Sequence, residues 1–204
     1  MLSRSVGFIG NRPDLGARAL AADREALQVA VGTDAGRRVE ACASWGVGFY
    51  QGGEILLKRR PIDDRPVLGF DELVRGIKAD VLLGHIRTAT VGARTTENTH
   101  PFRYRQWIFA QTGTVPHFEG VREPLRESLP QFLARSVRGD SDAELVFHLF
   151  LSFLHDAGIL DRLDVSAASA REALRNTVSL VDRLCAEHGA GPSELNVMLA
   201  SSDF

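Results

Sequence analysis

The sequence is poor in the residues that would point to an unusual compartment or to a strongly charged partner. The chain of 204 residues has only two cysteines, and its formal net charge is −2. A chain of this length can bury roughly 70% of its unfolded surface, so neither a disulfide nor a structural metal is needed for stability. Because the charge is so small, no long-range attraction draws the chain to nucleic acid or to anionic membranes. The composition therefore favours small molecules and proteins as partners and argues against nucleic acid.

Long apolar runs are also absent. The longest one, at 145–154, is interrupted by His148 and Ser152 and is far shorter than the roughly 20 residues of a membrane span. The apolar stretch near the N-terminus has only about five residues, too few for the core of a signal peptide. We therefore expect a cytoplasmic protein without a membrane partner.

The motifs of many well-known enzyme and metal sites are missing as well. The chain has no Gly-x-Ser-x-Gly, no phosphate loop ending in Gly-Lys-Ser/Thr, no Gly-x-Gly-x-x-Gly after a strand and no Cys-x-x-Cys. His148 and His155 lie on one predicted helix, where packing or surface roles are favoured over metal binding. We expect no metal and no cofactor.

Several short apolar runs predict β-strands. Buried strands are expected where the sequence is almost continuously apolar, at 5–10, 80–86 and 106–110, and a further strand is expected at 195–199. Residues 45–50 and 54–58 flank the turn sequence Gln51-Gly52-Gly53, which is the pattern of a β-hairpin. Between these runs we expect weak helices at 17–31 and 70–77, a loop at 32–36 and a polar connection at 61–66.

The second half of the chain predicts two helices. The residues from Ser141 to Glu144 have the spacing of a capping box, and the apolar run after them indicates a helix buried between layers. A second capping box, from Ser169 to Glu172, predicts a helix with one apolar face, which contains Leu174, Val178, Val181, Cys185 and His188. Strands followed by helices and a final strand favour an α+β fold without a domain boundary.

Polar residues follow two of the predicted strands. The segment from His85 to Gly92 is followed by 98–102 and then by 107–113. Arg87 can clamp a carboxylate with paired N–H donors, and a threonine hydroxyl nearby can complete the grip. The chemistry alone leaves open the alternative that these side chains only bond to local backbone at the strand ends.

Six segments, in this order and approximate spacing, resemble the class II glutamine amidotransferases of the N-terminal-nucleophile hydrolase superfamily. They lie at 4–10, 45–50, 85–92, 98–102, 109–113 and 139–144. The most similar branch is the small stand-alone group that includes the amidohydrolase of ergothioneine biosynthesis. The resemblance implies one domain over 1–204, a four-layer αββα sandwich of two antiparallel sheets flanked by helices. Because the family continues with further strands, we expect a domain truncated at its C-terminus.

The resemblance also implies the substrate, glutamine or another γ-glutamyl compound, and a set of site residues. Carried over by position, Arg87 and Thr90 would hold the α-carboxylate, Asp142 would pair with the α-amino group, and His100 would shape the pocket. Gly113 would offer its backbone N–H at the oxyanion position. Asp142 has a structural alternative, because an acid in the first turn of a helix is stabilised by the helix dipole.

The catalytic positions depart from the family. Ser3 stands where the family has an N-terminal cysteine nucleophile, and a serine hydroxyl needs a positioned base. That base would be the α-amine, which here belongs to Met1, and the large side chain of Leu2 predicts that Met1 is retained. Thr112 replaces the asparagine of the oxyanion site. Cys42 cannot replace the nucleophile by sequence position.

Three hypotheses follow. The first is a degenerate amidotransferase-like protein that still binds glutamine or a γ-glutamyl compound, with weak or no amide hydrolysis. The second is an active amidohydrolase in which removal of Met1 and Leu2 exposes Ser3 as the nucleophile. The third is a non-catalytic subunit or scaffold that docks on an active paralogue. A homodimer or a complex with another enzyme subunit is compatible with all three.

Overall fold

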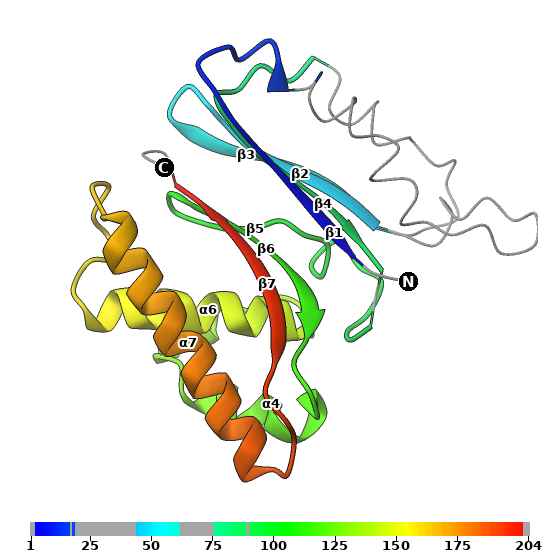
Figure 1. Cartoon of the computed structure of the whole chain (residues 1–204), viewed down its shortest axis with the longest axis vertical. Helices are drawn as coiled ribbons and strands as arrows, with labels where there is room; N and C mark the ends of the chain where they lie inside the picture. The colour runs from blue at the N-terminus through cyan, green and yellow to red at the C-terminus, as the bar shows by residue number, and fades with distance from the viewer. Residues whose placement is uncertain (1–2, 17, 19–43, 62–75, 89, 202–204) are drawn as a thin grey trace, which may run out of the picture. The chain divides into compact units, whose positions relative to one another are not determined.

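The computed structural model describes residues 3–16, 18, 44–61, 76–88 and 90–201 (Figure 1). Several predictions lie outside these residues. They are the helix at 17–31, the loop at 32–36, nearly all of the connection at 61–66 and most of the helix at 70–77, together with the retention of Met1 and the place of Cys42.

The strands of the first half form a four-stranded antiparallel sheet in the order β1-β4-β2-β3. Its members are β1 (Arg4–Ile9), β2 (Ser44–Gln51), β3 (Glu54–Arg60) and β4 (Val81–Arg87). The predicted hairpin is confirmed, with Gly52 and Gly53 at φ 62° and 80°, as a two-residue turn with left-handed conformation requires. β4 is buried as predicted, because its side chains enter apolar clusters on both faces of the sheet.

The strand at 5–10 is confirmed as β1, but the prediction that it is buried is wrong. β1 lies at an edge of the sheet, and its residues are either partly buried or exposed. Ile9 is 72% exposed. The apolar run could not reveal this, because its position in the sheet depends on pairing with the distant β4.

Both faces of this sheet carry apolar side chains. One face contributes Trp45, Val47, Leu82 and Ile86 to a buried cluster. The other contributes Ile55 and Leu83 to a cluster that also contains Ile108, Ala110 and Ala200. The last three residues come from the second sheet, so the two sheets pack together through this cluster.

The second sheet has three strands in the order β5-β6-β7. These are β5 (Phe102–Tyr104), β6 (Trp107–Thr114) and β7 (Glu194–Ala200). β6 confirms the strand expected at 106–110 and extends it to Thr114, and β7 confirms the one at 195–199. β5 has only three residues and was not predicted.

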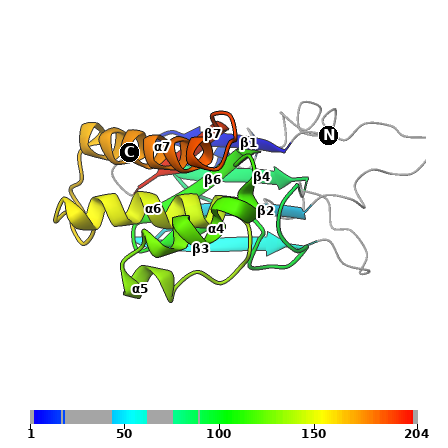
Figure 2. The same cartoon turned by 90° about the horizontal axis from the view of Figure 1, so that it is seen from below.

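The helices follow one another between β6 and β7 (Figure 2). They are α4 (Phe118–Glu127), α5 (Gln131–Ala134), α6 (Asp142–Asp156) and α7 (Ala167–Glu187), and α6 contacts the other three. The predicted burial of α6 is confirmed, since most of its residues are buried. No helix in the described part of the chain is long and apolar enough to cross a membrane.

One of the two predicted helix starts is correct. The Ser141 hydroxyl accepts a hydrogen bond from the Glu144 N–H and caps α6. The Glu144 carboxylate accepts from the N–H groups of Arg138 and Gly139, at 2.9 and 2.6 Å. It therefore anchors the loop that leads into α6.

The predicted start of α7 at Ser169 is wrong. The N-cap is Ser166, whose hydroxyl accepts a hydrogen bond from the Ser169 N–H at 3.1 Å, so α7 begins three residues earlier. Cys185 is fully buried, as predicted, but Leu174 and Val178 are only partly buried. The buried face of α7 consists of Ala170, Ala173, Thr177, Val181, Leu184 and Cys185.

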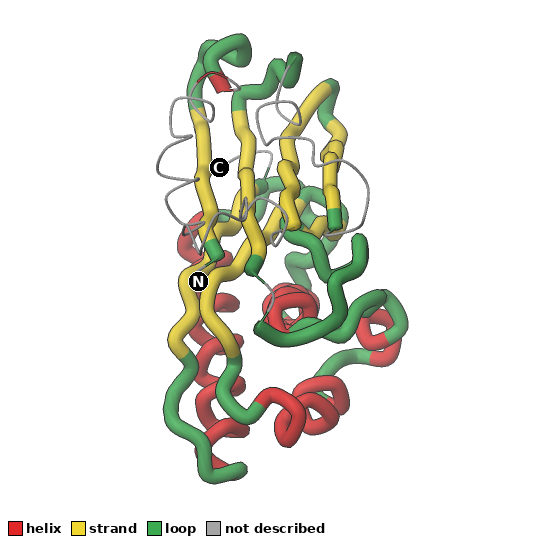
Figure 3. Tube along the Cα trace, turned by 90° about the vertical axis from the view of Figure 1, so that its right-hand side faces the viewer, coloured by secondary structure: helices red, strands yellow, loops and turns green. Residues whose placement is uncertain are grey.

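The chain divides into two compact units, which we call unit 1 and unit 2. Unit 1 contains the described residues of 1–89, 94–112 and 197–202, and unit 2 those of 90–93 and 113–196. Unit 1 thus holds the four-stranded sheet, and unit 2 holds α4 to α7. The strands of both sheets and the helices are distinguished by colour in Figure 3. β6 and β7 each contribute residues to both units.

Candidate functional site

Ser3, the residue at the expected nucleophile position, immediately precedes β1. Its hydroxyl oxygen accepts a hydrogen bond from the Thr88 N–H at 3.0 Å and donates its proton to the Thr88 carbonyl oxygen at 3.2 Å. Thr88 follows β4, which is the antiparallel partner of β1. The register of the two strands therefore brings Ser3 to the backbone of Thr88.

Beside this contact, one face of the four-stranded sheet carries polar side chains, which we call the polar strip: Ser5, Ser44, His85 and Arg87. Ser5 is the register partner of His85, and Ser44 is that of Arg87. Opposite residues in a sheet share a face, as do residues two apart in one strand. The hydroxyls of Ser5 and Ser44 are buried and have no hydrogen-bond partner among the described residues.

Arg87 ends β4 and is 5% exposed. Its guanidinium gives the polar strip a positive charge. This charge contributes to lowering the pKa of His85 and of His100. A buried guanidinium presents N–H donors in a fixed fork that suits a carboxylate. The position and burial of Arg87 thus fit an anion-binding role, and its role toward glutamine stays a prediction.

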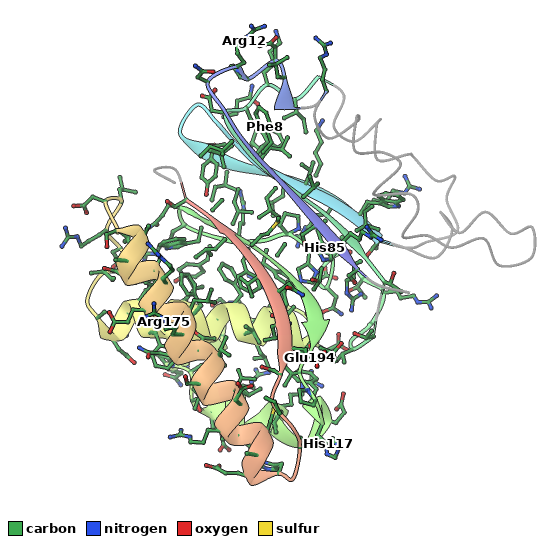
Figure 4. The ribbon with its side chains drawn as sticks, in the orientation of Figure 1. Phe8, Arg12, His85, His117, Arg175 and Glu194 are labelled. Carbon is green, nitrogen blue, oxygen red and sulfur yellow. The ribbon has the colours of Figure 1, made fainter. Side chains whose placement is uncertain are left out.

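His85, which is labelled in Figure 4, connects the polar strip with the second sheet. Its Nε2 lies 3.0 Å from the Gln111 carbonyl oxygen of β6. Because a carbonyl oxygen only accepts, Nε2 carries the proton in this contact. Burial, with a smaller contribution from Arg87, lowers the pKa of His85 to about 3. The ring is therefore neutral at pH 7.

His100, predicted to shape a pocket, stacks on His85 with ring centroids 4.2 Å apart. Burial also lowers the pKa of His100 well below its ordinary value, and neither of its ring nitrogens has a hydrogen-bond partner in the described part of the chain. Gly46 of β2 permits this arrangement, because a Cβ there would collide with the His100 carbonyl. The structure thus brings two neutral histidines together.

The expected oxyanion residues follow Gln111 on β6. Thr112 is partly buried and belongs to unit 1, whereas Gly113 is exposed and belongs to unit 2. Gly113 has φ 106°, and a Cβ at this position would collide with the Glu194 carbonyl of β7. Glycine is therefore required here by the backbone, whatever its role toward a ligand.

In unit 2, Thr90 and Asp142 are both engaged with other parts of that unit. The hydroxyls of Thr90 and Thr114 lie 2.8 Å apart. Asp142, in the first turn of α6, accepts hydrogen bonds from the N–H groups of Val115, at 2.8 Å, and Ala143, at 2.9 Å. These bonds fix the Asp142 carboxylate at the start of α6, and its role toward an α-amino group stays a prediction.

His85 was part of the segment 85–92 that the sequence analysis singled out, but no role was predicted for it. The available signal was a second histidine, His100, in the neighbouring segment 98–102, although a link to Gln111 could not be inferred from spacing. Among the described residues, no group of three or more His, Cys, Asp or Glu side chains could hold a metal ion. The absence of a metal and of a cofactor stays a prediction.

Comparison with known proteins decides the family. The family described as glutamine amidotransferases class-II matches residues 28–201. The chain belongs to this family. The match spans both units and contains Arg87, Thr90, His100, Thr112, Gly113 and Asp142. Ser3 precedes the match, so its equivalence to the family's nucleophile depends on the motif that follows it.

Individual class-II glutamine amidotransferase relatives are distant. The chain is 27% identical over 112 residues to the probable glutamine amidotransferase DUG3 of Saccharomyces cerevisiae, covering 53% of this chain and 31% of that protein. The chain thus matches about a third of that relative's length.

Solved structures show the same fold. A class-II domain protein from Silicibacter pomeroyi aligns with TM-score 0.57 and 22% identity, covering 78% of this chain and 64% of that one. Glutamine phosphoribosylpyrophosphate amidotransferase from Bacillus subtilis aligns with TM-score 0.54 and 16% identity, covering 97% of this chain and 35% of that one. The fold is therefore α+β, with two antiparallel sheets, and resembles that of N-terminal-nucleophile hydrolases.

Proposed function

We propose that this class-II glutamine amidotransferase-like protein binds glutamine or another γ-glutamyl compound and hydrolyses its amide weakly or not at all. The observation that carries the proposal is the double hydrogen bond between the Ser3 hydroxyl and the Thr88 backbone. A serine becomes a nucleophile when a base takes its proton. Here the proton is directed to a carbonyl oxygen, which is not a base.

Two features of the sequence support weak chemistry. The nitrogen of Ser3 is joined to Leu2 in a peptide bond, and an amide nitrogen cannot serve as the base that an α-amine provides. Thr112 takes the place of the oxyanion asparagine, and loss of one such donor typically costs about 10²- to 10³-fold in turnover. Both effects lower the rate of hydrolysis without removing the groups proposed to bind substrate.

The binding part of the proposal rests on three residues carried over from the family. Arg87 and Thr90 are assigned to the α-carboxylate of the glutamyl group, and Asp142 to its α-amino group. The burial of Arg87 and of the Asp142 carboxylate supports these roles. We assign His100 to the wall of the pocket and Gly113 to the oxyanion position.

We further propose that units 1 and 2 belong to one glutamine amidotransferase type 2-like domain with the four-layer αββα arrangement of the family. Two observations support this. The family match extends across both units, and β6 and β7 each contribute residues to both. Small-angle X-ray scattering of the protein tests the proposal, because an αββα sandwich predicts a single compact particle.

Three measurements on the purified protein test the function. Intact mass spectrometry determines the first residue, a coupled assay measures glutamate release from glutamine, and a thermal-shift titration measures binding of millimolar L-glutamine, with D-glutamine as control. We expect Ser3 to remain internal, little glutamate release, and a melting temperature raised by L-glutamine, since a ligand that binds only the folded state stabilises it.

The alternatives give different results. Ser3 as the first residue together with glutamate release would show an active amidohydrolase. If L-glutamine and γ-glutamyl dipeptides leave the melting temperature unchanged, the chain is a scaffold or non-catalytic subunit that lacks a glutamyl site.

A further inference from the structure

The backbone of β6 is held by a side chain from the other sheet just before the oxyanion position. The β5–β6 pairing ends at Phe102 and Phe109, so the Gln111 carbonyl lies beyond it. His85 of β4 donates to this carbonyl at 3.0 Å. Gln111 is followed directly by Thr112, so the contact acts on the peptide group that joins these two residues.

His85, which makes this contact, and His100, which stacks on it, are both costly for the fold. The Nδ1 atom of His85 and both ring nitrogens of His100 are buried without a hydrogen-bond partner among the described residues. Unsatisfied buried polar atoms destabilise the folded state, and apolar side chains of the same shape avoid that loss. Stability alone therefore does not account for two stacked histidines next to the polar strip.

We propose that His85 is a positioning residue for the glutamyl site, acting through the Gln111–Thr112 peptide. Because a peptide group is planar, a hydrogen bond that fixes the Gln111 carbonyl also fixes the plane of the peptide that leads into Thr112 and Gly113, and Gly113 carries the N–H that we assign to the oxyanion position. His100 holds the His85 ring by stacking at 4.2 Å. Donors oriented before binding raise affinity, because less order is lost when the ligand arrives. This inference rests on the proposed function.

The location of His85 supports the same role. It lies two residues before Arg87 on the same face of β4, and its register partner is Ser5 of β1. One strand therefore carries both the expected carboxylate clamp and the side chain that orients the end of β6. A substitution of His85 should therefore weaken binding of the ligand although Arg87 itself is unchanged.

The test compares substitutions of His85 that differ in whether an N–H group can still donate to the Gln111 carbonyl. Glutamine places its amide nitrogen near the Nε2 position of histidine, whereas asparagine is shorter and leucine has no donor. We expect His85→Gln to bind L-glutamine within about threefold of the wild type, and His85→Leu and His85→Asn to bind about tenfold more weakly or worse. Isothermal titration calorimetry measures the affinities, and circular dichroism checks the fold.

His148→Leu is the matched control. His148 is also a buried histidine, and its Nδ1 contacts a backbone carbonyl, that of Glu144, at 2.8 Å within α6. We expect this variant to lose stability while its affinity for L-glutamine stays that of the wild type. If His85→Leu does not fold, the comparison of His85→Asn with His85→Gln decides, because both side chains are neutral amides.

Two results would overturn the inference. If His85→Asn and His85→Leu bind L-glutamine as the wild type does, or if His85→Gln is as weak as His85→Asn, His85 has only a structural role and the proposed function stands. If the wild type itself does not bind a glutamyl ligand, the proposed function fails and the inference fails with it. The two failures are distinguished by the wild-type titration.

Discussion

The Ser3 hydroxyl and the Thr88 backbone form a reciprocal pair, in which Thr88 N–H donates to the oxygen at 3.0 Å and the hydroxyl donates to the Thr88 carbonyl at 3.2 Å. This pair joins the residue before β1 to the residue after β4. It gives Ser3 a structural role at the position predicted for the nucleophile. If this role is only structural, substitution of Ser3 should change the stability of the protein and not its rate of amide hydrolysis.

Replacing Ser3 tests this expectation. Ser3→Ala removes both hydrogen bonds and leaves the Thr88 groups partly buried without them, so we expect a loss of about 1–2 kcal/mol in the free energy of unfolding. For a chain of this size that loss lowers the melting temperature by about 2–8 °C. Glutamate release should stay at its wild-type level, because the proposed function gives the Ser3 hydroxyl no part in hydrolysis.

The control is Ser128→Ala, where an exposed hydroxyl donates to a carbonyl of its own helix, that of Pro124. It should change the melting temperature very little, since water can replace this bond. Loss of all measurable glutamate release in Ser3→Ala, with the fold retained, would assign Ser3 to catalysis.

Arg87 tests the binding half of the proposal. Arg87→Lys keeps the positive charge but loses the planar fork that bonds both oxygens of a carboxylate. We expect about tenfold weaker binding of L-glutamine, or worse, by isothermal titration calorimetry. Arg12→Lys is the control, because Arg12 pairs with Asp14 on the surface of the molecule. Equal affinities for wild type and Arg87→Lys would remove Arg87 from the site.

Much of the fold could be predicted because its signals are local. The hairpin of β2 and β3 needs only two apolar runs and a glycine turn, and α6 needs only a cap and an apolar run. β5 could not be predicted, since three residues carry no periodicity. The edge position of β1 was missed for a different reason, because it depends on which distant strand pairs with it.

The site was predictable only in part. The sequence placed Arg87 at the end of a buried strand, and the structure agrees. The contact of Ser3 with Thr88 and that of His85 with Gln111 join residues 85 and 26 positions apart. Such contacts depend on the register of β1 against β4 and on the packing of two sheets, which spacing in one sequence does not contain.

Two serines near the start of α7, Ser166 and Ser169, are both candidates for the N-cap by sequence, and the structure assigns this role to Ser166. Ser166 caps the helix, and Val165 before it and Ala170 after it are both buried, which are the positions of a hydrophobic staple. Ser166→Ala should destabilise the protein by about 1 kcal/mol. Ser169→Ala should cost less, because Ser169 contributes its backbone N–H to the cap. Urea unfolding measures both, and a larger loss for Ser169→Ala would move the helix start.

The buried histidines predict a loss of stability in acid. The pKa of His85 is about 3 in the folded protein against an ordinary value of 6.5. Between these values the unfolded chain binds more protons, so stability is greatest above pH 6.5 and falls as the pH decreases toward 3. The slope for one such group is about 1.4 kcal/mol per pH unit. His100 adds to it in the same direction.

Urea unfolding at pH 7, 6 and 5 measures this dependence. The decrease in unfolding free energy from pH 7 to 5 should be smaller in His85→Gln than in the wild type, because one titrating group is gone. Ser128→Ala, which removes no titratable group, should keep the wild-type decrease. An unchanged decrease in His85→Gln would mean that His85 is not the group that titrates.

Gly113 separates the demands of the backbone from those of a ligand. Its φ of 106° is a conformation that other residues adopt only with strain, and a Cβ would also collide with the Glu194 carbonyl. Gly113→Ala should therefore destabilise the protein by about 2 kcal/mol or more.

Gly120→Ala is the matched control, because Gly120 lies within α4 with open space around its Cβ position. Since alanine favours a helix interior, that variant should gain about 0.5–1 kcal/mol. Unfolding of both variants in urea measures the two changes, and equal effects at the two positions would show that the strained conformation of Gly113 is not needed to join β6 to β7.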